Sequence, residues 1–239
     1  CVYFAKNMLE ARGESLKGKK CTVSGSGNVS IYTIEKLYHL GALPITCSDS
    51  SGMILDEEGI DLELLKDLKE NQRARLTEYV KYRKNAKYIP VDSYPKGRNA
   101  VWSVPCFAAF PSATQNELNL EDAKELIKNG CVCVSEGANM PSTNEAVDFF
   151  VAQKIAYGPG KAANAGGVAT SQLEMAQNAS MVSWTFEEVD AKLEKIMKHI
   201  FDTASATAKE FGEPTNLVLG ANIAGFRRVA DAMIEQGIV

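Results

Sequence analysis

The feature that most constrains this chain is a glycine-rich turn between a short apolar run and a helical pattern, within residues 19–31. Residues 21–23 are apolar, as in a buried parallel strand, and apolar side chains then recur at helical spacing from Ile31 to Leu40. Gly25 can adopt the backbone angles of a tight turn, and Gly27 leaves the amides at the helix start open to a phosphate. The order of strand, glycine turn and helix predicts a cradle for a pyrophosphate.

The spacing within this turn is that of a dinucleotide-binding loop, with Ser30 at the third glycine position. Asp49, 24 residues after Gly25, closes a second predicted strand at 44–48, near where such folds place an acidic residue on the ribose. A tight turn without a ligand is the alternative. We expect the cradle to consist of Gly25, Ser26, Gly27, Asn28 and Val29.

The remaining pattern predicts an α/β fold. Short apolar runs alternate with helical stretches, the runs being 88–91, 104–110, 131–134 and 155–157 and the stretches 62–84, 120–129 and 143–153. Such alternation is typical of a doubly wound, mostly parallel, Rossmann-like sheet. We expect one dinucleotide-binding domain over 1–239, with a lead-in helix at 1–13, a Rossmann core at 19–160 and a helical C-terminal segment at 161–239.

Composition narrows the classes of partner. A net charge of −4 argues against a nucleic-acid partner, and no run of 18 apolar residues suggests a membrane span. With no leader pattern before the first strand either, we expect a cytoplasmic protein. The six cysteines lie mostly in apolar runs, which favours free thiols. Only two histidines are present and neither has ligand spacing, so we expect no metal site.

Three polar loops follow predicted strands, at 113–117, 136–141 and 158–171, where an open parallel sheet places its ligands. A nicotinamide carboxamide offers one acceptor and two donors, so Thr114, Gln115 and Asn139 are sensible partners. Ordinary turn and cap use of these residues is the alternative. In the third loop, the amides after Gly166 and the Ser171 hydroxyl could meet a carboxylate near the ring, although the glycines could instead serve close packing.

The evidence on coenzyme type conflicts within the sequence. Asp49 suits the ribose hydroxyls of NAD and would repel a 2′-phosphate. Ser50 and the basic cluster Lys69, Arg73 and Arg75 favour a 2′-phosphate, unless the cluster is only a solvated helix face. Because two charge-assisted hydrogen bonds could outweigh one solvated repulsion, we predict NADP(H) over NAD(H).

Several long segments resemble the coenzyme domain of hexameric, NADP-specific glutamate dehydrogenases. The similarity covers essentially the whole chain and is carried by residues 25–29, 48–52, 113–118, 136–141, 160–178 and 220–226. The resemblance implies that Thr114, Gln115 and Asn139 contact the nicotinamide half and that Asn164 lies beside it. It also implies that Val168 and Ser171 line a glutamate pocket.

By the same resemblance, the catalytic lysine and aspartate belong to an N-terminal substrate domain that this chain does not include. The expected function is the coenzyme-binding half of an enzyme of amino-acid metabolism. Such an enzyme converts L-glutamate, NADP and water to 2-oxoglutarate, ammonia and NADPH, and works as a homo-hexamer. No catalytic residue is expected in this chain. A stand-alone nucleotide-binding or regulatory Rossmann module without catalysis is the alternative, and the Ser171 pocket favours the enzyme.

Overall fold

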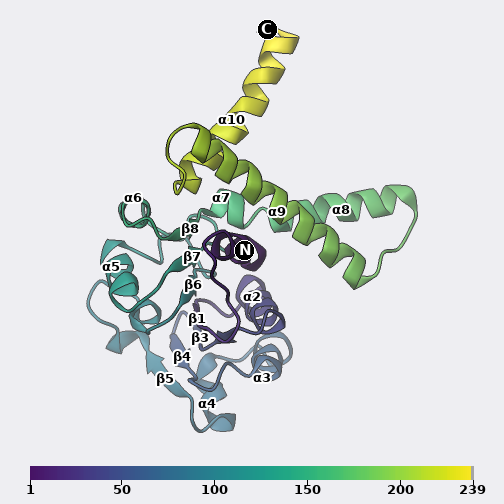
Figure 1. Cartoon of the computed structure of the whole chain (residues 1–239). Helices are drawn as coiled ribbons and strands as arrows, with labels where there is room; N and C mark the ends of the chain where they lie inside the picture. Colours follow the sequence, from purple (N-terminus) through teal and green to yellow (C-terminus); the bar gives the residue numbers. More distant parts are fainter. Residues whose placement is uncertain (238–239) are drawn as a thin grey trace.

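The computed structural model describes residues 1–237 and contains a parallel sheet at its centre (Figure 1). Each strand is short and almost entirely buried, in keeping with the apolar runs of the sequence. The strands lie in the order β2-β1-β6-β7-β8 and all pair in parallel. Their bounds are β1 Lys20–Val23, β2 Leu43–Pro44, β6 Ala108–Phe110, β7 Cys133–Ser135 and β8 Ala156–Gly158.

Helices cover both faces of this sheet, which confirms the doubly wound α/β prediction. On one face, α1 (Val2–Glu10) and α2 (Asn28–His39) bury residues such as Phe4 and Ile34. On the other, α5 (Leu120–Lys128) and α6 (Asn144–Ala152) bury residues such as Leu126 and Phe150. The chain runs from β1 outward to β2 and then returns to continue from β6, so the carboxyl ends of β1 and β6 flank a topological switch point.

A second, antiparallel sheet corrects the sequence-based strand assignment. The run at 88–91, expected in the parallel sheet, forms β5 (Lys87–Pro90), which pairs antiparallel with β4 (Gly52–Leu55). The strand predicted at 44–48 is divided into β2 and β3 (Thr46–Asp49). The division falls where the Thr46 hydroxyl bonds the backbone N–H and C=O of Val23, each at 2.9 Å, in place of ladder bonds.

The long helix predicted at 62–84 is also wrong. The segment breaks into α3 (Leu62–Lys66), a π-helical turn (Asp67–Asn71), a 3₁₀ turn (Leu76–Glu78) and α4 (Tyr79–Tyr82). Two features mark the break: Asp67 accepts hydrogen bonds from the side chains of Asn71 and Gln72, and Arg73 takes a left-handed backbone angle (φ 51°). The chain therefore reverses and brings Arg75 and Leu76 to the end of β3.

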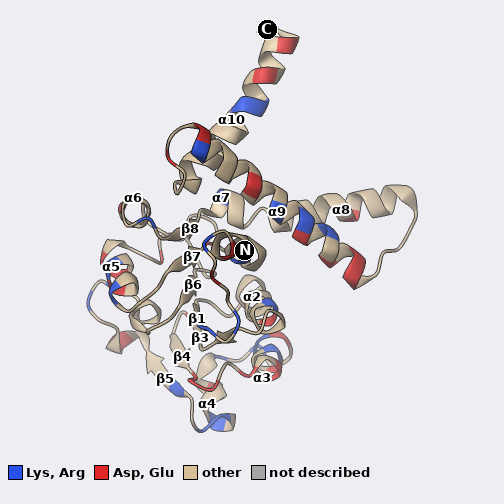
Figure 2. Cartoon of the chain, viewed as in Figure 1, with Lys and Arg blue, Asp and Glu red and all other residues tan. Residues whose placement is uncertain are grey.

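The C-terminal segment predicted to be helical, 161–239, is mostly helical as far as Gln236, and residues 238–239 lie outside the described part of the chain. Figure 1 shows α8, α9 and α10 extending away from the sheet, and Figure 2 shows few charges on α8 and many of both signs on α9. The α9 helix returns to α1, where Phe201 meets Phe4 edge to face, and Asp190 binds Lys36 of α2 at 2.8 Å. These helices are α7 Gly160–Ala163, α8 Gly166–Ser180, α9 Phe186–Glu210 and α10 Leu217–Gln236. Two further 3₁₀ turns occur at Val91–Ser93 and Ala100–Ser103.

Candidate functional site

The glycine turn connects β1 directly to α2 at the switch point of the sheet. Gly25 has a left-handed backbone angle (φ 81°), and its amide donates to the Ser48 hydroxyl at 2.7 Å. The first intrahelical bond of α2 runs from Ile31 N to Gly27 O at 2.9 Å. The amides of residues 28–30 precede that bond, so they present their N–H groups beyond the helix end, where an anion is favoured.

Ser30 explains how this turn works without the third glycine. Its buried hydroxyl donates to Ser24 O at 2.7 Å and to Ser112 O at 3.2 Å, so it ties the turn to the loop after β6. A Cβ on Gly25 would lie 2.3 Å from the same Ser30 hydroxyl. The close approach therefore requires glycine at position 25.

We expect Gly25→Ala to destabilise the fold by roughly 2–6 kcal/mol. A left-handed non-glycine residue costs about 1–3 kcal/mol, and the clash with Ser30 adds an overpacking cost of about 1–3 kcal/mol. Gly18→Ala is the matched control, because Gly18 has a similar angle (φ 72°) and an added Cβ there meets nothing within 4 Å. Urea unfolding of the two variants checks this, and equal losses would contradict the role given to the Ser30 contact.

A cleft of about 1000 Å³ opens in front of the glycine turn. One wall is the turn itself, and a second comes from the end of β3, with Asp49 and Ser50. The loop after β6 contributes Thr114, and residues 94–99 close the far side. The cleft therefore lies outside the carboxyl ends of the strands at the switch point, where open α/β sheets bind ligands.

At the β3 end, the Asp49 carboxylate is engaged by the protein itself. One oxygen accepts from Ser51 N at 2.9 Å and from the Ser51 hydroxyl at 2.6 Å, and the other accepts from Leu76 N at 3.0 Å. Burial acts to raise the pKa of Asp49, but these hydrogen bonds outweigh it and hold the pKa below its usual value. Arg75 Nη1 donates to the Ser50 hydroxyl at 2.7 Å, which places a guanidinium at the rim of the cleft.

The loops after β6 and β7 are held together by their backbones. Asn116 N donates to Met140 O and Leu118 N donates to Pro141 O, both at 3.0 Å. Within the first loop, Glu117 Oε1 accepts from the amides of Ala113 at 2.9 Å and Thr114 at 3.3 Å. Glu117 therefore fixes the backbone that carries Thr114 into the cleft.

A second cleft, of about 600 Å³, lies between α2 and the helices α8 and α9. Its lining includes Asn164, Gly166 and Ser171, and it shares Asn28 and Val29 with the first cleft. The Asn164 amide donates to Asn139 Oδ1 at 2.9 Å, so the loops at 136–141 and 158–171 also meet. The two clefts therefore adjoin at the start of α2.

The family model for Glutamate/Leucine/Phenylalanine/Valine dehydrogenase matches residues 1–237. The chain belongs to this family. It is 66% identical to an NADP-specific glutamate dehydrogenase of Helicobacter pylori strain J99 and 48% identical to that of Escherichia coli K12, in each case over all of the chain. A solved glutamate dehydrogenase of Plasmodium falciparum superposes with a TM-score of 0.92 at 47% identity. The chain spans 53%, 52% and 50% of the lengths of these three proteins.

In this dehydrogenase-family chain, most of the predicted site residues meet at the two clefts. The first is lined by Gly25, Ser26, Gly27, Asn28, Val29, Asp49, Ser50 and Thr114, and the second by Asn28, Val29, Asn164 and Ser171. Five predicted residues are not among the lining residues of either cleft: Lys69, Arg73, Gln115, Asn139 and Val168. Lys69 donates to Ala74 O at 3.0 Å, and the side chain of Val168 is 68% exposed.

Sequence reasoning missed two carboxylates and one loop at or near the two clefts. Glu117 and Glu136 occur in the segments that carried the family resemblance, but neither was singled out. The signal that could have identified Glu136 is its position directly after a predicted strand. The loop at 94–99 lines the first cleft although it carries only an ordinary Pro-Lys-Gly turn pattern.

Two further sequence expectations concern thiols and metals. All six cysteines, which lie within the described residues, are free thiols, and five of them are buried. Over residues 1–237, no group of three or more His, Cys, Asp or Glu side chains is placed to hold a metal ion. In the same range, no helix is both long and apolar enough to cross a membrane.

Proposed function

We propose that the chain is the coenzyme-binding half of an NADP(H)-dependent glutamate dehydrogenase and positions the nicotinamide for hydride transfer. One observation carries the proposal: the glycine turn at the switch point opens into a cleft of about 1000 Å³, which shares Asn28 and Val29 with a second cleft lined by Asn164 and Ser171. A module that only binds nucleotide has no evident need for the second cleft. The names of the relatives support glutamate and NADP as the substrate and coenzyme.

In this proposal the first-turn amides of α2 bind the pyrophosphate, and Thr114 contacts the nicotinamide half. Asn164 lies beside the ring, and the Ser171 hydroxyl faces a carboxylate of L-glutamate or 2-oxoglutarate. Gln115 and Asn139 are exposed on the same loops and are proposed as further partners of the carboxamide, as is Val168 for the substrate. The NADP(H) supplies the hydride acceptor and donor, while these residues bind and orient it.

We further propose that residues 1–239 form a single coenzyme domain of a longer homo-hexameric, cytoplasmic enzyme. Support comes from the chain spanning about half the length of its relatives, and from the thiols being free. The helices α8 to α10 would belong to the same domain, because α9 packs on α1.

The preference for NADP(H) is proposed to depend on Ser50 and Arg75, with Lys69 and Arg73 contributing positive charge nearby. Both oxygens of Asp49 already accept hydrogen bonds from Ser51 or Leu76, which makes Asp49 a poorer partner for ribose hydroxyls. Arg75 already contacts Ser50, so a 2′-phosphate between them would receive charge-assisted hydrogen bonds.

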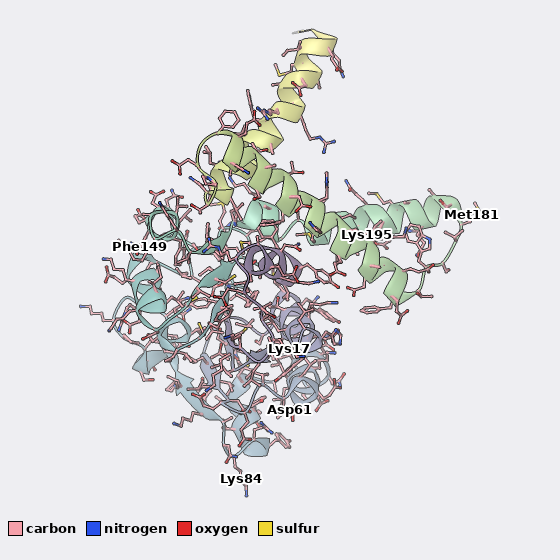
Figure 3. The ribbon with its side chains drawn as sticks, in the orientation of Figure 1. Lys17, Asp61, Lys84, Phe149, Met181 and Lys195 are labelled. Carbon is pink, nitrogen blue, oxygen red and sulfur yellow. The ribbon has the colours of Figure 1, made fainter. Side chains whose placement is uncertain are left out.

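We expect the chain to bind NADPH about a hundredfold more tightly than NADH, and Arg75→Ala to remove at least about tenfold of that preference. The control Lys84→Ala removes the same charge at an exposed site, labelled in Figure 3, that is not among the lining residues of the first cleft. Fluorescence titration of both nucleotides checks this. Equal binding of NADH and NADPH by the unaltered chain would reject the preference, and equal effects of the two variants would reject the role of Arg75.

A further inference from the structure

Glu136 is a buried carboxylate at the carboxyl end of β7, and only 4% of its surface is exposed. One oxygen accepts from the Tyr157 hydroxyl of β8, and the other accepts from Gly160 N at the start of α7, both at 2.7 Å. Burial raises the pKa of Glu136, and these hydrogen bonds oppose that shift. The side chain therefore ties the end of β7 to the next strand and to the helix that follows.

The loop beyond β8 fits closely around this carboxylate. A Cβ on Gly160 would lie 3.2 Å from Glu136 Oε2 and 3.2 Å from Ala138 O. Glycine at position 160 thus allows the amide N–H to approach the carboxylate directly. The backbone adds a parallel tie, since Glu136 N donates to Gly158 O at 3.1 Å.

The same loop closes a ring of hydrogen bonds at the nicotinamide end of the proposed site. Asn164 N donates to Gly160 O at 2.9 Å, and the Asn164 amide donates to Ala138 O at 3.3 Å and to Asn139 Oδ1 at 2.9 Å. The ring runs from Glu136 through Gly160 and Asn164 to Asn139, which returns along the chain to Glu136. Shifting the carboxylate would change how the two amide side chains face each other.

We infer that Glu136 is a positioning residue, which acts through Gly160 to orient Asn139 and Asn164 toward the nicotinamide of the bound coenzyme. Glu136 itself need not touch the coenzyme. This inference rests on the proposed function, because it needs a nicotinamide dinucleotide in the clefts. If Glu136 positions the two amides, its loss must selectively weaken binding of the nicotinamide end of the ligand. Loss of a carboxylate with only a structural role would not have this selective effect.

The test compares NADPH with 2′-phospho-ADP-ribose, which keeps the second ribose and lacks only the nicotinamide, by calorimetry on the whole chain. The unaltered chain is expected to bind NADPH on the order of tenfold more tightly than 2′-phospho-ADP-ribose, because about two ordinary hydrogen bonds supply a difference of that size. Glu136→Leu is expected to bring the affinities for the two ligands to within about twofold of each other, mostly by weakening the binding of NADPH. Glu136→Gln is expected to retain most of the difference, because its oxygen can accept from Gly160 N while its amide donates to the Tyr157 hydroxyl.

Two more variants keep the test decisive. Gly160→Ala pushes the contact apart without removing the carboxylate, so it is expected to reduce the difference even if Glu136→Leu does not fold. Asp56→Asn is the control: Asp56 is a fully buried carboxylate that accepts from the Tyr79 hydroxyl at 3.2 Å and from Arg83 Nε at 3.0 Å, and it is not among the lining residues of either cleft. It is expected to lower stability and leave the difference unchanged.

Three outcomes would overturn the inference. If Glu136→Leu weakens the binding of both ligands equally, then Glu136 has only a structural role. Where the leucine variant does not fold, the same result with Gly160→Ala leads to the same conclusion. If the unaltered chain binds both ligands equally, then the amides do not engage the nicotinamide, although coenzyme binding stands. If the unaltered chain binds neither ligand, then the proposed function itself fails, and that result is distinct from the other two.

Discussion

Replacing Gly27 by valine is expected to weaken NADPH binding by at least about a hundredfold and to leave the fold intact. An added Cβ at Gly27 meets nothing within 4 Å, and the backbone angle there (φ −89°) is one that valine accepts. The new side chain would therefore fill the cleft in place of the pyrophosphate. Loss of two charge-assisted hydrogen bonds at about 1.5–3 kcal/mol each gives this magnitude.

Calorimetric titration of NADPH measures this effect, with a thermal unfolding scan of each protein to show that both are folded. Gly225→Val in α10 is a suitable control, because Gly225 is exposed, is not among the lining residues of either cleft and also has open space for a Cβ. It is expected to bind NADPH like the unaltered chain. If Gly27→Val and the unaltered chain bind NADPH with equal affinity, the glycine turn is not part of the binding site.

The second large effect is an absence of turnover: the 239-residue chain alone is expected not to oxidise glutamate. The reaction needs a base near the amine, a water activated for attack on the iminium carbon, and stabilisation of developing charge. Lys36 lines the second cleft but is bound to Asp190 and to the Tyr3 hydroxyl. Burial acts to lower the pKa of Lys36, but these contacts outweigh it, so the amine stays protonated and is no base.

Lys161 and Thr170 do not supply that base either. Lys161, the lysine of the third polar loop, donates to Asn222 of α10 at 2.6 Å and is not among the residues lining either cleft. Thr170 is bonded to Gly166 O at 2.9 Å. The open crevice also offers no exclusion of water, which hydride transfer requires and which a second domain closing over it would provide.

An assay of NADPH formation at saturating glutamate tests this expectation on the chain and on a full-length relative. Activity at least about a thousandfold lower for the chain is expected, because orientation and acid-base catalysis each contribute factors of a hundred or more. Turnover by the chain alone that survives Ser171→Ala would contradict both the need for a second domain and the substrate role of Ser171.

The local parts of the fold could be predicted because their causes are local. The turn at 25–30 needs only a strand, two glycines and a helix in sequence, and those residues lie where the pattern placed them. The prediction of a helix at 62–84 was wrong because its apolar spacing continues past Arg73, whereas the chain turns there at a left-handed angle and Leu76 N then donates to Asp49 at the end of β3. Spacing alone carries no information about such long-range contacts.

The same limit explains what was missed in the site. Glu117 lies in a loop chosen for its amides, and its two backbone partners become evident only when the loop is folded. Glu136 meets Tyr157 and Gly160, which are 21 and 24 residues away along the chain. Arg75 donates a hydrogen bond to Ser50, which lies 25 residues earlier in the chain. This contact distinguishes Arg75 from Lys69 and Arg73 in the basic cluster, and it is evident only in the folded chain.

The most direct test of the central claim is an amide-resolved NMR titration of the unaltered chain with NADPH. If the coenzyme pyrophosphate binds at the start of α2, the backbone amide signals of Gly27, Asn28 and Val29 must shift most strongly and saturate at one equivalent. Signals from the distal half of α10 should stay in place. Saturation with these three amides unmoved, or with the largest shifts elsewhere, would contradict the proposal that this turn binds the coenzyme.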